Sequence, residues 1–349
     1  MKSLAVKYRP VMFDDVTEQT SIKVILQEQI STRSIKNGYL FCGSAGTGKT
    51  TCARIFANEI NDGHGTPIEM DAASNNSVDD IRNVIAQAQT KSLDSEYKIF
   101  IIDEAHSLSN SAWQAMLKTL EEPPAKSIFI FCTTDPQKIP KTILSRVQRY
   151  DFQRISQQGI VKRLDWILAQ EVKEGNLPEG DHQDLDAVEY LAKLADGGMR
   201  DAITLMDKCL SYSTELTVEN VVKALGIANY DIMFSLLDGL IEHKAEYVLE
   251  QIDSIYSSGI DMKQFVKSFT EFVLDICKYG LTKDFSLVKI PNTYVSELEQ
   301  YGDYEYNTSK ELLKTLIQLN AEIKWETSVK YCVEAKLFIF CEVENDSTV

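Results

Sequence analysis

One segment of the sequence combines glycines, a lysine and hydroxyl side chains at the spacing of a phosphate-binding loop. It follows the apolar run 38–42 and fits the pattern G-x-x-x-x-G-K-[ST]. Its residues are Gly43, Ser44, Ala45, Gly46, Thr47, Gly48, Lys49, Thr50 and Thr51. Glycines let backbone N–H groups turn toward an anion, and a helix beginning near Lys49 would point its positive end at the same anion. We therefore expect a nucleoside triphosphate to bind here, with Lys49 at its β and γ phosphates and Thr50 at Mg²⁺.

Two acidic residues, Asp103 and Glu104, end a second apolar run at 97–102. The run predicts a buried parallel strand. Beside a phosphate loop, Asp103 would hold Mg²⁺ through water and Glu104 would polarise an attacking water molecule. Without that loop, a strand that merely ends at exposed carboxylates would be the better interpretation.

Three further polar residues follow in an order typical of a motor or switch ATPase. Thr134 lies just after the fourth expected strand, where its hydroxyl could sense a γ-phosphate or orient water. Arg146 could act on the nucleotide of a neighbouring subunit, as arginine fingers do, and Arg200 could reach the γ-phosphate from the start of a helix. Each arginine alone fits an ordinary surface residue. Their order after the loop and the acidic pair favours the functional interpretation.

Alternating strand and helix patterns predict how these residues are positioned. Strands are expected at 38–42, 67–70, 97–102 and 127–132, and helices at 49–59, after a cap near Ser77, and at 111–121. Such alternation predicts an α/β fold, a parallel sheet with helices on both faces. From Ser156 onward apolar residues recur at helical spacing, over 188–195, 201–211, 218–225 and 232–240. We expect three domains, 1–155, 156–225 and 226–349, with a long loop at 284–307.

Composition narrows the class of protein. The 349 residues include 36 Lys and Arg and 52 Asp and Glu, which gives a net charge of −16. Residues 1–155 hold 18 basic and 18 acidic residues, so all the excess negative charge lies in residues 156–349. A basic surface or ordinary scatter would explain the cations of the first part equally well. Those cations are Lys138, Lys141, Arg146, Arg149 and Arg154.

No long apolar run or signal sequence is present, so we expect a cytoplasmic protein without membrane contact. The seven scattered cysteines and four histidines indicate buried thiols in a reducing compartment and no metal site.

The order of these motifs resembles the AAA+ clamp loaders, most closely the gamma and tau family of bacterial DNA polymerase III subunits. Besides the phosphate loop, the resemblance is carried by residues 7–10, 13–16, 69–74, 102–106, 117–124, 133–138, 144–146 and 199–202. It is strong from residue 7 to about 210 and thins beyond. It implies an AAA+ ATP-binding domain, a small helical lid domain and a helical collar that holds subunits together.

The resemblance also implies ATP and Mg²⁺ as ligands, and a role for each matching residue. Lys49 and Thr50 would contact phosphate and Mg²⁺, Asp103 would contact Mg²⁺, and Glu104 would be the catalytic carboxylate. Thr134 would be the first sensor, Arg200 the second sensor, and Arg146 the finger that completes a neighbour's site. The adenine pocket would be lined by Tyr8, Arg9 and Pro10. The implied partners are a sliding clamp, primer-template DNA and other loader subunits in an open five-membered spiral.

Three departures from the family pattern modify these expectations. Only residues 61–67 stand where cellular members insert a four-cysteine zinc module, so we expect no zinc. Val147 replaces the usual cysteine after Arg146, which should leave the arginine's role intact. The sequence stops at Val349 without the long tail of tau subunits. A compact loader of the kind a phage could encode fits these losses.

Two other functions compete with clamp loading. The run 103–106, Asp-Glu-Ala-His, spells a helicase box, but helicases need a second sheet domain that the helical half does not predict. The chain could instead be a non-hydrolysing scaffold subunit, although it retains Lys49, Thr50, Asp103 and Glu104. Contact with DNA is a hypothesis that rests on the family and on cations such as Arg82 and Lys118, which equally fit a solvated helix face.

Overall fold

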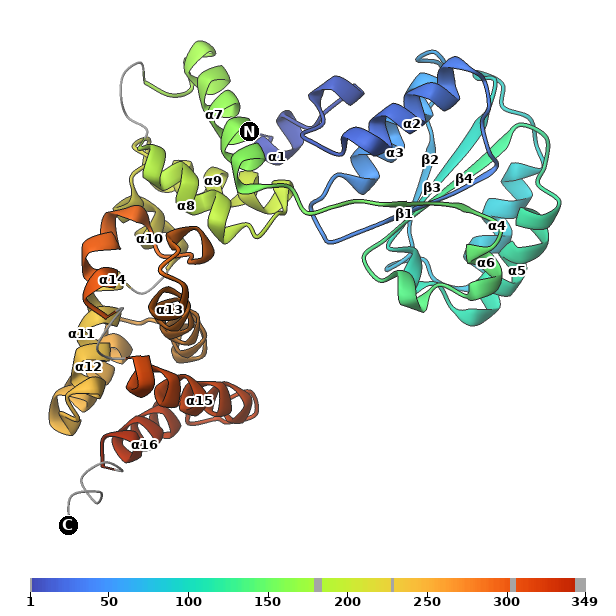
Figure 1. Ribbon diagram of the computed structural model, residues 1–349. Coiled ribbons are helices and arrows are strands. Elements are labelled where there is room, and N and C mark those ends of the chain that lie inside the picture. Colours follow the sequence, from blue (N-terminus) through green and yellow to red (C-terminus); the bar gives the residue numbers. More distant parts are fainter. Residues whose placement is uncertain (1, 179–183, 227–228, 302–305, 343–349) are drawn as a thin grey trace. The chain divides into compact units, whose positions relative to one another are not determined.

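Five parallel strands form a sheet in the order β2-β3-β4-β1-β5 (Figure 1). The strands are β1 (Gly38–Cys42), β2 (Ile68–Asp71), β3 (Lys98–Asp103), β4 (Ser127–Thr133) and β5 (Gln148–Asp151). Cys42 pairs with Thr133 and Asp151, and Asp71 pairs with Asp103, so all carboxyl ends share one edge. The expected α/β fold is confirmed, and four strands lie where the sequence predicts them.

Helices cover both faces of the sheet, because alternate strand residues point to opposite sides. Tyr39 and Phe41 belong to a buried cluster with α2 (Thr20–Ser31) and α3 (Lys49–Ile60). Leu40 belongs to a second cluster, on the other face. The helices of that cluster are α4 (Val78–Ala88), α5 (Asn110–Glu121) and α6 (Lys141–Leu144). The expected cap at Ser77 is confirmed, since its hydroxyl accepts from Asp80 N in a capping box.

This computed structural model describes residues 2–178, 184–226, 229–301 and 306–342. The chain packs as two units, residues 1–170 with 195–207, and residues 171–194 with 208–349. The first unit contains the sheet, α1 (Leu4–Lys7), the short 3₁₀ turns η1 (Phe13–Asp15), η2 (Ala105–Ser107) and η3 (Pro136–Lys138), and most of α7 (Gln157–Lys173) and α9 (Met199–Tyr212). The three-domain division stays a prediction.

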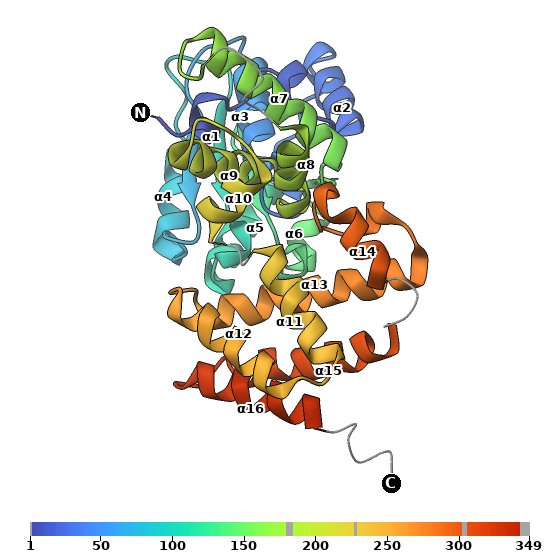
Figure 2. The ribbon, with the colours of Figure 1, turned by 90° about the vertical axis from the view of Figure 1, so that its left-hand side faces the viewer.

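Helices make up the regular structure that is described for the second unit, as the sequence predicts beyond residue 156. They are α8 (Leu185–Leu194), α10 (Val218–Leu225), α11 (Tyr230–Ile241), α12 (Ala245–Ser257), α13 (Met262–Thr282), α14 (Val295–Tyr301), α15 (Tyr306–Glu322) and α16 (Val329–Glu342), with 3₁₀ turns η4 (Phe285–Leu287) and η5 (Asn292–Tyr294). Helix α13 packs against α15, and α12 packs against α16 (Figure 2).

The long loop expected at 284–307 is wrong for most of its length. Residues 285–287 and 292–294 form 3₁₀ turns, and α14 occupies 295–301, while 302–305 lie outside the described residues. Leu298 and Tyr301 lie one helical turn apart and are both buried. Tertiary packing of these two side chains stabilises a short helix whose many acids and tyrosines do not predict one.

In the described ranges no single helix is long and apolar enough to cross a membrane. Helices α10 and α11 reach that length only when counted together across a bend of 80°. Both helices bury apolar side chains within the second unit, among them Val221 and Leu236.

Candidate functional site

The loop between β1 and α3 needs glycine at two positions for different steric reasons. Gly43 has φ +148°, and a Cβ there would lie 2.5 Å from Phe152 O. Gly46 has φ +72°, and its Cβ would lie 3.0 Å from the Cα of Gly198. The left-handed backbone and these close approaches exclude larger residues. The loop thus lies close against Phe152, which follows β5, and against Gly198, which precedes α9.

Backbone donors of this loop are available for an anion. Of the described residues, none accepts a hydrogen bond from the backbone N–H groups of residues 45–49. These groups precede and begin α3, where the helix dipole also favours negative charge. The arrangement fits a phosphate group, as the glycine pattern predicts.

Lys49 lies buried at the start of α3. Its ammonium donates to Gly43 O at 2.9 Å and to Ser44 O at 2.7 Å. Burial lowers the pKa of Lys49, and the nearby acidic groups Glu104 and Asp103 oppose that shift. A buried cation held by neutral carbonyls is well suited to binding an anion, which would offset the cost of its desolvation.

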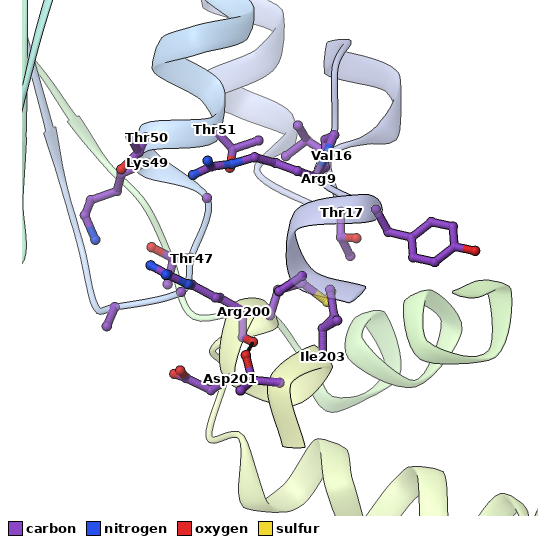
Figure 3. A pocket seen from close by; sticks show the side chains of 18 of the residues that line it. Arg9, Val16, Thr17, Thr47, Lys49, Thr50, Thr51, Arg200, Asp201 and Ile203 are labelled. Carbon is purple, nitrogen blue, oxygen red and sulfur yellow. Dashed lines mark hydrogen bonds between the residues drawn. The ribbon is translucent and has the colours of Figure 1, made fainter. Parts of the chain in front are cut away.

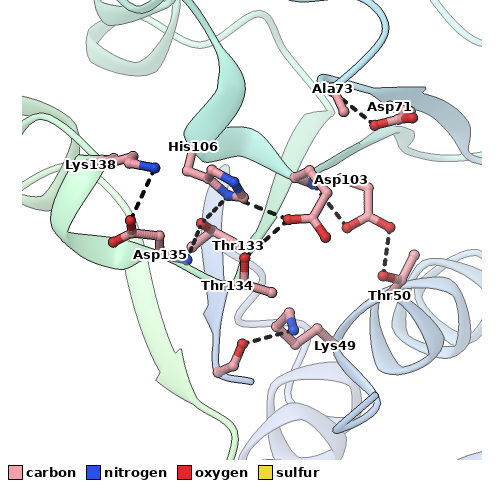
Figure 4. Close-up of polar contacts among 12 residues, drawn as sticks. Lys49, Thr50, Asp71, Ala73, Asp103, His106, Thr133, Thr134, Asp135 and Lys138 are labelled. Atoms are coloured by element: carbon pink, nitrogen blue, oxygen red, sulfur yellow. Dashed lines mark hydrogen bonds and ion pairs between the residues drawn. The ribbon is translucent and has the colours of Figure 1, made fainter. Parts of the chain in front are cut away.

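The Thr50 hydroxyl and the Asp103 carboxylate meet beside this lysine (Figure 4). Thr50 Oγ1 donates to Asp103 Oδ2 at 2.8 Å, and the backbone N–H of Glu104 donates to Asp103 Oδ1 at 3.0 Å. The hydroxyl and carboxylate oxygens are hard ligands of the type that Mg²⁺ prefers. The two residues predicted to bind Mg²⁺ are thus brought together.

Glu104 follows β3 in a left-handed backbone conformation, with φ 47° and ψ 42°. Non-glycine residues rarely adopt this conformation, and those that do are concentrated at active sites. The Thr134 hydroxyl donates to Glu104 Oε2 at 3.3 Å, and His106 Nδ1 lies 3.3 Å from the same oxygen. The predicted catalytic carboxylate and the predicted first sensor are therefore in contact.

A pocket of about 680 Å³ adjoins the loop, within the first unit (Figure 3). Its lining includes the predicted adenine-pocket residues Tyr8, Arg9 and Pro10, together with Lys49, Thr50, Asp103, Glu104 and Arg200. Arg9 Nε donates to Thr51 Oγ1 at 3.2 Å, which ties the N-terminal segment to α3. Burial, and then the neighbouring Arg54 guanidinium, lowers the pKa of Arg9.

Arg200 reaches this pocket because α9 begins against the loop between β1 and α3. The backbone N–H of Met199 donates to Gly46 O at 3.0 Å. In Figure 3 the guanidinium ends of Arg9 and Arg200 both extend toward the loop and the start of α3. The predicted second sensor thus lies beside the loop.

Arg146 is placed elsewhere, since the described residues that line the pocket do not include it. Its guanidinium contacts Glu121 and donates to Thr142 O at 2.6 Å. Carboxylates also partner three other cations of the predicted basic cluster. These pairs are Lys138 with Asp135, Arg149 with Asp151, and Arg154 with Asp196. The local surface is therefore less basic than the cations alone indicate.

Sequence reasoning missed several contacts that shape the site. Gln19 donates through Nε2 to Gln153 O at 2.7 Å and to Thr47 O at 3.4 Å, and Gln153 N donates back to its Oε1. Arg163 Nη2 donates to Tyr8 O at 2.9 Å. No motif or periodicity marks these residues, because each contact joins segments more than 25 residues apart.

Two family models match parts of the chain. The model described as DNA polymerase III, delta subunit, matches residues 66–156, and the model for DNA polymerase III subunits gamma and tau domain III matches residues 216–320. The first match contains the strand end with Asp103 and Glu104. The second begins shortly before α10 and ends within α15.

Similarity to characterised proteins extends over most of the sequence. DNA polymerase III subunit tau of Bacillus subtilis is 34% identical over 97% of this chain, which spans only 63% of that protein. DNA polymerase III subunit gamma of Buchnera aphidicola subsp. Schizaphis graminum is 31% identical, with 77% of this chain and 78% of that protein covered. Among solved structures, the Thermotoga maritima RuvB Holliday junction branch migration motor matches with a TM-score of 0.51 at 17% identity, over 73% of this chain and 86% of that one. This last likeness shows the AAA+ fold alone.

Proposed function

Because this chain belongs to the gamma and tau family of DNA polymerase III subunits, we propose that it binds and hydrolyses ATP as a subunit of a sliding-clamp loader. ATP binding would drive assembly on the clamp and on primer-template DNA, and hydrolysis would release the loaded clamp. The proposal goes beyond family membership, because the activity depends on the chemistry of the site.

One observation carries the proposal. Thr50 contacts Asp103 at 2.8 Å and Thr134 contacts Glu104 at 3.3 Å, so two acidic residues from one strand end meet two hydroxyls from other elements. Lys49 lies beside both pairs (Figure 4). A scaffold subunit without hydrolysis would not require this convergence.

Each group has a distinct task in hydrolysis. Lys49 and the N–H groups of residues 45–49 would bind the β and γ phosphates, and Thr50 and Asp103 would hold Mg²⁺. Bound Mg²⁺ supplies positive charge that offsets the charge on the phosphate oxygens. Glu104 would take a proton from the water that attacks the γ-phosphorus, while the bond to the bridging oxygen breaks and ADP leaves.

Assembly would complete the site. Arg146 lies outside the pocket of its own subunit, and we propose that it acts on the ATP of a neighbouring subunit within a five-membered spiral.

We also propose that cations on two helices contact DNA phosphates. They include Lys118 on α5 and Arg82 on α4, and Arg82 lies 2.9 Å from Asp79 in this structure. Phosphate contacts of this kind predict that DNA-stimulated turnover falls steeply as salt rises.

The test separates ATP binding from ATP turnover in the assembled protein. Glu104→Gln keeps the shape of the side chain but removes the base, so we expect ATP binding within about twofold of wild type and turnover lower by at least about a hundredfold. Lys49→Ala should lose both. Retention of full turnover by Glu104→Gln would contradict the catalytic assignment and favour a scaffold role.

A further inference from the structure

His106 contacts the proposed catalytic carboxylate, although the roles proposed above do not include it. It lies in η2, two residues after Glu104, with 19% of its side chain exposed. Its Nδ1 atom is 3.3 Å from Glu104 Oε2 and 3.1 Å from Thr133 Oγ1. One ring nitrogen therefore lies between β4 and the residue that follows β3 (Figure 4).

The chemistry of the partners decides which ring nitrogen carries a proton. An ionised carboxylate only accepts hydrogen bonds, so its approach to Nδ1 is attractive when Nδ1 carries hydrogen. Thr133 Oγ1 already accepts from Asp135 N at 3.0 Å, and a hydroxyl oxygen has a second lone pair that can accept from Nδ1–H. A proton on Nδ1 makes its approach to Glu104 Oε2 attractive, and the Thr133 hydroxyl, which can either donate or accept, is compatible with that tautomer.

The same carboxylate oxygen accepts a hydrogen bond from the residue that follows β4. Thr134 Oγ1 donates to Glu104 Oε2 at 3.3 Å. Within the part of the chain that is described, no hydrogen bond or ion pair is made by Glu104 Oε1. His106 and Thr134 together hold Oε2 and leave Oε1 to accept a proton.

We propose that His106 is a positioning residue that fixes the rotation of the Glu104 carboxylate through its Nδ1–H group. This inference rests on the proposed ATP hydrolysis, in which Glu104 is the base. The contact with Thr133 also joins the orientation of Glu104 to the last residue of β4, directly before Thr134. A base held in one orientation meets its water more often than a freely rotating one.

Two amide substitutions discriminate this role from simple bracing of the turn. The Asn side-chain nitrogen reaches the place of Nδ1, whereas the Gln nitrogen reaches the place of Nε2. His106→Asn should therefore retain most of wild-type kcat. His106→Gln and His106→Phe should lower kcat by about tenfold to a hundredfold, part of the 10²–10⁴ that a positioned base supplies. KM and nucleotide affinity should stay within about twofold of wild type in all three variants.

The experiment measures kcat, KM and nucleotide binding in the assembled protein, with Glu104→Gln alongside. Nitrogen-15 spectra of the histidine rings provide a readout independent of turnover, with the His106 signal assigned by its loss in His106→Phe. A proton on Nδ1 in the wild type, and a changed His106 signal in Glu104→Gln, would support the contact. The inference is overturned by full kcat in His106→Phe beside inactive Glu104→Gln, or by His106→Asn performing no better than His106→Gln. Full activity of Glu104→Gln would instead overturn the proposed function.

Discussion

Thr50 Oγ1 donates to Asp103 Oδ2 across 2.8 Å, which joins the first turn of α3 to the last residue of β3. The two side chains come from segments 53 residues apart. Their contact places a hydroxyl and a carboxylate at one point beside the buried Lys49. Mg²⁺ takes six oxygen ligands in octahedral geometry, and under the proposed function these two oxygens would supply part of that set.

Replacement of this hydroxyl should weaken the response to Mg²⁺. Thr50→Val preserves the side-chain shape but removes the oxygen, so the Mg²⁺ concentration for half-maximal ATP turnover should rise by on the order of tenfold. Thr51→Val is the matched control, because the Thr51 hydroxyl accepts from Arg9 and does not contact Asp103. A Mg²⁺ titration of turnover in both variants checks this, and equal shifts would contradict the assignment of Thr50.

Motifs and periodicity predict the parts of the site that are local in sequence. The loop, the buried β3 and the acidic pair 103–104 lie where the patterns place them. The edge strand β5 was missed because it has four residues of which only Tyr150 is buried, which leaves little alternation to detect. The contacts of Gln19 with Gln153 and of His106 with Thr133 depend on tertiary structure, and no sequence pattern marks them.

The buried Lys49 charge should cost stability in the absence of nucleotide. Burial lowers its pKa below 10.5 in the folded chain. The cost is therefore present below the folded-state pKa and disappears as pH rises above the unfolded value. Lys49→Met should raise the urea midpoint of unfolding at pH 7, and the difference from wild type should shrink at pH 10, while turnover falls by at least about a hundredfold.

Urea unfolding at the two pH values measures this difference, and the exposed Lys36→Met is the control, for which we expect no such trend. A lower urea midpoint for Lys49→Met than for wild type at pH 7 would contradict the prediction that the buried charge is destabilising. In that outcome the bonds to Gly43 O and Ser44 O would outweigh the cost of burial.

Two glycines of the loop should tolerate alanine to different degrees. Both Gly43 and Gly48 have positive φ, but only the Cβ at Gly43 would meet a backbone atom, Phe152 O at 2.5 Å, whereas no atom lies within 4 Å at Gly48. Gly48→Ala should therefore cost only backbone strain, about 1–2 kcal/mol. Gly43→Ala should cost about 3 kcal/mol or more, because the backbone of Phe152, which follows β5, must also move. Equal losses in urea unfolding would contradict this steric explanation.

Arg146 should act across a subunit boundary, because it lies outside the pocket that contains its own Glu104 and instead contacts Glu121. Arg146→Ala should retain ATP binding and lose at least about a hundredfold in turnover, since an arginine finger stabilises charge that develops in the transition state.

Mixing the Arg146→Ala protein with the Glu104→Gln protein should restore part of the turnover. In random assemblies about a quarter of the sites would join an intact Glu104 to an intact Arg146 from the neighbour. A mixture of Glu104→Gln with Lys49→Ala should stay inactive, because both defects lie on the same side of the site. Absence of recovery in the first mixture, with assembly confirmed by mass measurement, would exclude action in trans.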